Sequence, residues 1–101
     1  MKLRGTIEGE PVVVLIDCGA THNFISENLV QKLQLPMTAT SSYGVLMGTG
    51  NAVQAAGLCK GFKISLQDID IIEDFLPLAL GSADVILGMQ WLERIRPMQV
   101  N

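Results

Sequence analysis

The fold is decided by one stretch of the sequence, Leu15-Ile16-Asp17-Cys18-Gly19-Ala20-Thr21. This stretch places an ionisable carboxylate directly after the aliphatic run Val12–Ile16. Burying a lone carboxylate costs free energy, so Asp17 needs hydrogen bonds or a partner. Gly19 lets the backbone pass close to Asp17 and donate amides to it. From the residues alone two interpretations stay open: a functional carboxylate, or a strand-end Asp that caps the next turn.

The residues before Asp17 predict a β-hairpin. Lys2–Glu8 alternates between apolar and polar positions, which is typical of a half-buried strand. Gly9-Glu10-Pro11 is typical of a turn. Val12–Ile16 is apolar without alternation, which favours a strand covered on both faces. In the first strand, the residues expected on the inner side are Leu3, Gly5 and Ile7.

A short helix and a second hairpin are expected next. Asn23 or Ser26 can cap the helix, which ends before Pro36. Its apolar stripe, at spacings of four, consists of Ile25, Leu29 and Leu33. Residues 37–67 are expected to be β structure. They contain a turn between Val45-Leu46 and Ala52-Val53 that consists of Met47, Gly48, Thr49, Gly50 and Asn51.

The remainder of the chain adds further strands. An alternating pattern runs from Phe62 to Ile71, with Asp68 and Asp70 expected outward. Phe75–Leu80 is a further apolar strand, and its Pro77 favours an edge or a bulge.

The last part of the chain predicts one more strand and a helix. Val85–Gly88 reads as a buried strand that ends in a glycine turn. Met89–Ile95 can form a short helix, which Pro97 ends. The sequence therefore predicts a mostly β fold with one or two short helices.

Composition narrows the class of protein. The 101 residues predict one domain over 1–101, and an apolar fraction of 49% argues against disorder. A net charge of −3 gives no basic stripe for nucleic acid. We expect neither a membrane span nor a signal peptide, because the longest apolar run is Val12–Ile16. Cys18 and Cys59 make no disulfide framework, which favours a reducing compartment.

Three marks in order resemble the retropepsin family of aspartic proteases. Leu15–Thr21 resembles its signature of two hydrophobic residues, Asp, Ser or Thr, Gly, and Ala or Ser. The longer string from Asp17 to Ser26 is similar to proteases of plant Ty3/gypsy retrotransposon polyproteins. Ala83–Leu92 resembles the family's late hydrophobic-hydrophobic-Gly strand and the helix after it, and the hairpin at Gly48-Thr49-Gly50 lies where the family has its flap.

The resemblance implies a fold and a mechanism. The fold is a closed, barrel-like half-lobe with a flap hairpin, and the active form is a homodimer. Asp17 of each subunit supplies the catalytic dyad, which activates water for peptide hydrolysis. Cys18, Gly19, Ala20 and Thr21 form the active-site loop, and Gly48, Thr49, Gly50 and Asn51 form the flap over the substrate.

The resemblance also implies partners and a location. The substrate is polypeptide, namely a retrotransposon Gag-Pol polyprotein, and neither a metal nor another cofactor is needed. No nucleic acid or membrane partner is implied. The expected location is the cytoplasm, either free or within virus-like particles. The terminal residues Met98–Asn101 are expected to add to an intersubunit sheet.

One residue departs from the family pattern. The residue after the catalytic Asp is usually Ser or Thr, and its hydroxyl helps to lock the two active-site loops together. Here the position holds Cys18, whose thiol is a weaker donor. This departure favours a looser dimer, or a catalytically silent dimerisation or binding module of a degenerate or domesticated retroelement. That module is the alternative function.

Three other readings carry less weight. Cys18 with His22 could form a thiol nucleophile and its base, or with Cys59 a metal site, but the chain has no further histidine. Asp84 could be a second catalytic Asp, yet no Asp-Ser/Thr-Gly triplet begins there, which favours a loop or capping position. The acidic side chains near residue 70 are expected to form the solvated face of a strand rather than a cation site; they are Asp68, Asp70, Glu73 and Asp74.

Overall fold

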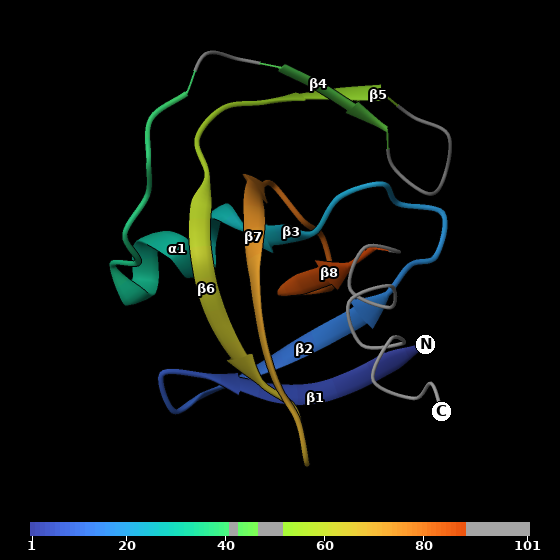
Figure 1. Cartoon of the computed structure of the whole chain (residues 1–101), viewed down its shortest axis with the longest axis vertical. Coiled ribbons are helices and arrows are strands. Elements are labelled where there is room, and N and C mark those ends of the chain that lie inside the picture. The colour runs from blue at the N-terminus through green and yellow to red at the C-terminus, as the bar shows by residue number, and fades with distance from the viewer. Residues whose placement is uncertain (41–42, 47–51, 89–101) are drawn as a thin grey trace, which may run out of the picture.

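The strands of the computed structural model close into a barrel. The structure describes residues 1–40, 43–46 and 52–88. Within them six strands pair around the barrel in the order β1-β2-β8-β3-β7-β6, and β4 and β5 form a separate hairpin (Figure 1). The mostly β architecture predicted from the sequence is confirmed. The barrel strands are β1 (Lys2–Ile7), β2 (Glu10–Ile16), β3 (Phe24–Ser26), β6 (Cys59–Ser65), β7 (Asp70–Leu78) and β8 (Val85–Leu87).

The first hairpin forms as predicted, with its turn one residue earlier. β1 pairs with β2 in antiparallel register from Lys2↔Leu15 to Ile7↔Glu10. The turn is therefore Glu8-Gly9, both at positive φ, and Glu10 already belongs to β2. In β2, Val12 and Val14 are buried, whereas Pro11 is exposed and Val13 and Leu15 are half-buried. The strand is thus covered more completely on its inner face than on its outer face.

The helix α1 (Glu27–Leu33) begins at a serine cap. The Ser26 hydroxyl accepts a hydrogen bond from the Leu29 amide at 3.4 Å, so Ser26 rather than Asn23 is the N-cap. Gln34 in the left-handed region ends the helix before Pro36. Ile25 was expected on the helix and instead lies in β3, because the cap at Ser26 places it outside.

The β6–β7 region corrects the predicted strands. The alternation from Phe62 to Ile71 spans two strands, joined by a turn in which the Leu66 amide donates to the Ile69 carbonyl. The segment predicted as a separate strand from Phe75 lies mostly in the second half of β7. Glu73 is buried rather than solvated.

Pro77 lies where its missing N–H is tolerated. The pairing of β7 with β6 ends at Cys59↔Phe75, beyond which β7 pairs only with β3. The predicted edge position of Pro77 is therefore confirmed.

Two apolar clusters stabilise the barrel. The larger fills its interior and includes Val14 and Ile25, two of the fully buried residues. The smaller joins the loop after β2 to β7 and β8, and its buried members are Ala20, Phe24, Leu76, Leu78, Ala83 and Ile86. The segment that carries Asp17 is therefore anchored to the core on both sides.

The predicted second hairpin is present. β4 (Tyr43–Leu46) and β5 (Ala52–Ala55) pair with Val45 opposite Val53 and Leu46 opposite Ala52. In Figure 1 this hairpin arches over one end of the barrel. The predicted turn at Gly48, Thr49, Gly50 and Asn51 and the predicted helix Met89–Ile95 lie outside the described residues. In the described part of the chain, no helix is long and apolar enough to cross a membrane.

Candidate active site

Asp17 stands at the point where β2 leaves the barrel. Its backbone amide donates to the Leu87 carbonyl at 2.9 Å, which continues the parallel pairing of β2 with β8 by one residue. Its half-buried carboxylate accepts a hydrogen bond from the Gly19 amide at 3.0 Å. The predicted donation from this glycine to the carboxylate is confirmed. Backbone and side chain of Asp17 are thus held by different segments of the chain.

The loop after Asp17 wraps closely around Gly88. A Cβ atom at Gly88 would lie 2.6 Å from the His22 carbonyl oxygen and 2.7 Å from that of Ala20. The Ala20 amide also donates to the Asp17 carbonyl at 3.1 Å, which closes a tight turn. Gly88 therefore permits an approach of backbone to backbone that a side chain would prevent.

Asn23 is a member of this site that the sequence identified only as a possible cap. It is 2% exposed, and its Oδ1 accepts a hydrogen bond from the Gly88 amide at 2.9 Å. Its Nδ2 donates to the Asp74 carbonyl at 3.4 Å. The partner of the Oδ1 atom is distant in sequence, so no local pattern signals the role.

The other loop residues are differently exposed. Cys18 and Thr21 are exposed, whereas Ala20 is buried in the smaller cluster. His22 is half-buried, and its Nδ1 lies 2.8 Å from the Thr21 hydroxyl. The loop thus presents Cys18 and Thr21 to solvent and keeps Ala20 inside.

The structure does not bring the two cysteines into one site. Cys59 is buried in the larger cluster, whereas Cys18 is exposed on the loop. Burial raises the pKa of the Cys59 thiol, which keeps it protonated and unreactive. Among the described residues, no group of three His, Cys, Asp or Glu side chains is arranged to hold a metal ion.

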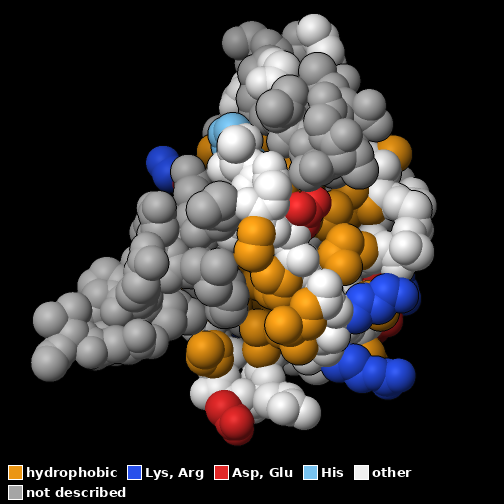
Figure 2. All heavy atoms as spheres, turned by 90° about the vertical axis from the view of Figure 1, so that its right-hand side faces the viewer, with side chains coloured by type: hydrophobic (Ala, Val, Ile, Leu, Met, Phe, Trp, Pro, Cys, Tyr) orange, Lys and Arg blue, Asp and Glu red, His pale blue; other side chains and the backbone are white. Residues whose placement is uncertain are grey.

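Figure 2 shows the side of the molecule toward which β2 points. Hydrophobic side chains gather in the middle of this face, an acidic side chain lies at their upper end, and Lys and Arg side chains lie toward the edges. Such a face, apolar in the middle and polar at the rim, is the kind that proteins use to bind one another.

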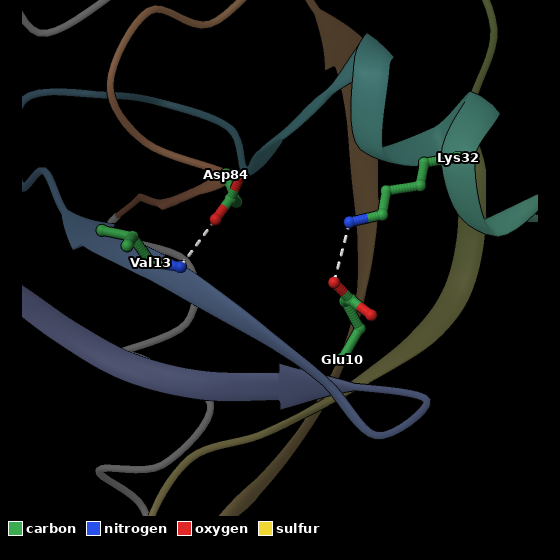
Figure 3. A network of polar contacts seen from close by, with 4 residues as sticks. All are labelled: Glu10, Val13, Lys32 and Asp84. Carbon is green, nitrogen blue, oxygen red and sulfur yellow. Dashed lines mark hydrogen bonds and ion pairs between the residues drawn. The ribbon is translucent and has the colours of Figure 1, made fainter.

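Asp84 has a structural role, which was predicted because no Asp-Ser/Thr-Gly triplet begins there. Its Oδ2 accepts from the Val13 amide at 2.8 Å (Figure 3). Its own amide donates to the Val13 carbonyl at 2.9 Å. Its carbonyl accepts from the Ser26 amide at 2.8 Å. Asp84 therefore joins the strand that carries Asp17 to the start of β8 and the end of β3.

An ion pair lies near Asp84. Lys32 of α1 donates to Glu10 of β2 at 2.8 Å (Figure 3). The hydrogen bond and charge of Glu10 raise the pKa of Lys32, with a smaller contribution from Asp84. Both side chains are exposed, so solvent screens the pair and its contribution to stability is small.

Asp84→Ala is expected to destabilise the fold by about 1–3 kcal/mol, because the Val13 amide loses a charged acceptor in a partly buried place. Urea denaturation measures the change. Glu10→Gln is the matched control, since it weakens only the exposed pair and should leave the midpoint almost unchanged. Equal stability of Asp84→Ala and the wild type would contradict the role of this carboxylate.

Comparison with known proteins identifies the family. A family model described as retroviral aspartyl protease matches residues 4–100. A search of curated proteins finds no match. The match covers nearly the whole chain, and its range includes the Asp17 loop, the β4–β5 hairpin and β8. The chain belongs to the retroviral aspartyl protease family.

Proposed function

We propose that this chain is an aspartic endopeptidase in which Asp17 is the catalytic residue. The observation that carries the proposal is the position of Asp17. Its carboxylate lies at the end of β2, held by the Gly19 amide, in a loop packed against Gly88. A carboxylate held in this way on a half-buried residue suits general acid–base chemistry on a bound peptide.

The active form is a homodimer. The dyad chemistry needs two carboxylates, and the only Asp-X-Gly triplet in the sequence is the one at Asp17. A single chain would thus hold half a site, completed by Asp17 of the partner subunit. The hydrophobic side chains on the face toward which β2 points support this arrangement, because they lie beside an acidic side chain and are suited to burial (Figure 2).

Hydrolysis proceeds through water held between the two carboxyl groups. At close range the two groups share one proton, because both cannot readily be charged. The unprotonated Asp17 takes a proton from water, and the water oxygen bonds to the peptide carbonyl carbon. The protonated Asp17 stabilises the carbonyl oxygen, and a proton passes to the amide nitrogen as the C–N bond breaks.

The substrate is a polypeptide, and the resemblance of Asp17–Ser26 supports a Gag-Pol polyprotein of a plant Ty3/gypsy retrotransposon. The presence of the β4–β5 hairpin supports the proposal that this segment is a flap over the peptide. Gly48, Thr49, Gly50 and Asn51, between the two strands in the sequence, would contact the substrate. Cys18, Gly19, Ala20 and Thr21 form the active-site loop. Processing of such a polyprotein takes place in the cytoplasm, either free or within virus-like particles.

A cleavage assay tests the proposal. The purified chain is incubated with the polyprotein segment encoded upstream of it, with and without pepstatin, and the fragments are identified by mass spectrometry. We expect defined cuts that pepstatin suppresses, and sedimentation at micromolar concentration should show a dimer. Cleavage by a strict monomer would contradict the dyad.

Cys18 favours a second candidate function, a silent dimerisation module. In that case the chain would dimerise and leave the polyprotein segment uncut at every enzyme concentration. The two candidates therefore differ in the cleavage assay and agree in sedimentation.

Cys18→Ser is expected to lower the Kd of the dimer. A hydroxyl is the stronger donor, and each new neutral hydrogen bond contributes about 0.5–1.5 kcal/mol, at two symmetric positions per dimer. Because Cys18 is exposed on the single chain, the hydroxyl stays solvated until the subunits meet. Sedimentation equilibrium of both proteins gives the two values of Kd. A weaker dimer in the variant would mean that the loop has adapted to sulfur.

A further inference from the structure

We propose that Asn23 is a positioning residue of the candidate active site. Its buried carboxamide fixes the peptide unit between Leu87 and Gly88, and through that unit it aims Asp17. The inference rests on the proposed function, because it assigns Asn23 a role in the same site.

The peptide unit between Leu87 and Gly88 contacts both ends of the loop 17–23. The Leu87 carbonyl accepts the Asp17 amide at 2.9 Å. The N–H of the same unit, that of Gly88, donates to the Asn23 Oδ1 at 2.9 Å. A peptide unit is planar and rigid, so fixing its N–H also fixes the direction of its carbonyl. Asn23 therefore acts on Asp17 without touching it.

The Asn23 side chain is itself fixed. The backbone N–H of Gly88 can only donate, so the carboxamide oxygen of Asn23 must face it. The NH2 group of the same carboxamide then points to the Asp74 carbonyl, 3.4 Å away. The backbone carbonyl of Asn23 accepts the Leu76 amide at 2.9 Å. Because the residue is 2% exposed, water does not readily replace these bonds. Asn23 thus ties the end of the loop to β7 as well as to Gly88.

Because the loop packs closely against Gly88, the hydrogen bond from Gly88 to Asn23 affects the position of the whole loop. The carbonyls of Ala20 and His22 lie within 2.7 Å of where a Gly88 Cβ would stand. A small rotation of the Leu87–Gly88 unit would therefore move the loop, and with it Asp17. Misplacing a catalytic group by about 1 Å can cost about a hundredfold in rate.

The test compares Asn23→Ala with Ser26→Ala. Both remove a buried polar side chain at or next to β3, but the Ser26 hydroxyl caps α1 and does not contact the loop. Both variants should lower the melting temperature. We expect only Asn23→Ala to lower kcat per folded dimer, by about ten- to a hundredfold, with KM within about threefold of wild type. Equal kcat values in the two variants would overturn the proposal.

Asn23→Asp supplies a conservative rescue. A protonated carboxyl accepts from Gly88 with one oxygen and donates to Asp74 with the other, as the amide does, whereas a carboxylate cannot donate. The kcat of the variant divided by that of wild type should therefore rise as the pH falls. The division cancels the titration of neighbouring groups that both proteins share, namely Asp17, His22, Glu73 and Asp74. A ratio independent of pH would contradict the proposal.

Hydrogen exchange separates this inference from the proposed function. NMR of the wild type and Asn23→Ala reports the protection of the Gly88 amide without any substrate. If the wild type cleaves nothing, the proposed function fails, and faster exchange at Gly88 in Asn23→Ala still supports the tie. Unchanged protection of that amide in Asn23→Ala would overturn the tie whatever the activity.

Discussion

Asp17→Asn is expected to abolish peptide hydrolysis without changing the fold. Asparagine is nearly isosteric and keeps an oxygen for the Gly19 amide, so the loop retains its hydrogen bond. Its amide can neither take a proton from water nor share one across the dimer. A positioned acid–base group contributes about a hundred- to ten-thousandfold to the rate, and here both copies are lost. Initial rates with a peptide from the polyprotein segment measure the loss, and circular dichroism checks the fold.

Asp84→Asn is the matched control for this substitution. Asp84 is also half-buried and also accepts a backbone amide, that of Val13, but it lies at the other end of β8 from Gly88. We expect the chemistry to remain and any effect to fall on stability. Activity of Asp17→Asn within about tenfold of wild type would exclude Asp17 as the general base.

Gly88→Ala is expected to damage both activity and stability. The new methyl group would stand 2.6 Å and 2.7 Å from two backbone oxygens, which have no flexible side chain to move aside. Overpacking of this kind costs about 1–3 kcal/mol, and relief requires the Asp17 loop to shift. Urea denaturation and initial rates should both report the loss.

Gly81→Ala is the control, because a Cβ there meets nothing within 4 Å and Gly81 is exposed. That variant should resemble wild type in both measurements. If Gly88→Ala also resembled wild type, the loop could not lie against Gly88 as the structure has it.

The elements that the sequence predicts well are those with local causes. The β1–β2 hairpin follows from alternation, and the start of α1 follows from Ser26, one of the two predicted caps, which lies three residues before the apolar Leu29. The β6–β7 turn was missed because Leu66–Ile69 contains neither glycine nor proline, and its one signal is the spacing of three residues from Leu66 to Ile69, which breaks the alternation. The burial of Glu73 was missed because its charge predicted exposure, although it lies on the same side of β7 as the buried Ile71.

In the candidate site too, the residues with local partners are predictable and those with distant partners are not. Asp17 and Gly19 are predictable, because the signature places carboxylate and donor two residues apart. Asn23 is not, because its acceptor role depends on Gly88, which is 65 positions away. A single sequence shows an asparagine before a short apolar segment, which is equally typical of a turn or a cap. The homodimer and the flap tip rest on the family resemblance and stay predictions.

The placement of β8 between β2 and β3 has a consequence for the order of events during synthesis. β2 is made early, but its neighbour β8 is the last barrel strand to leave the ribosome. Until then both β2 and β3 have an open edge, and the Asp17 amide has no Leu87 carbonyl to meet. Pairing of strands so distant in sequence is slow, because the loop between them must close first. The backbone of Asp17 is therefore fixed against β8 only after the chain has been made as far as Leu87.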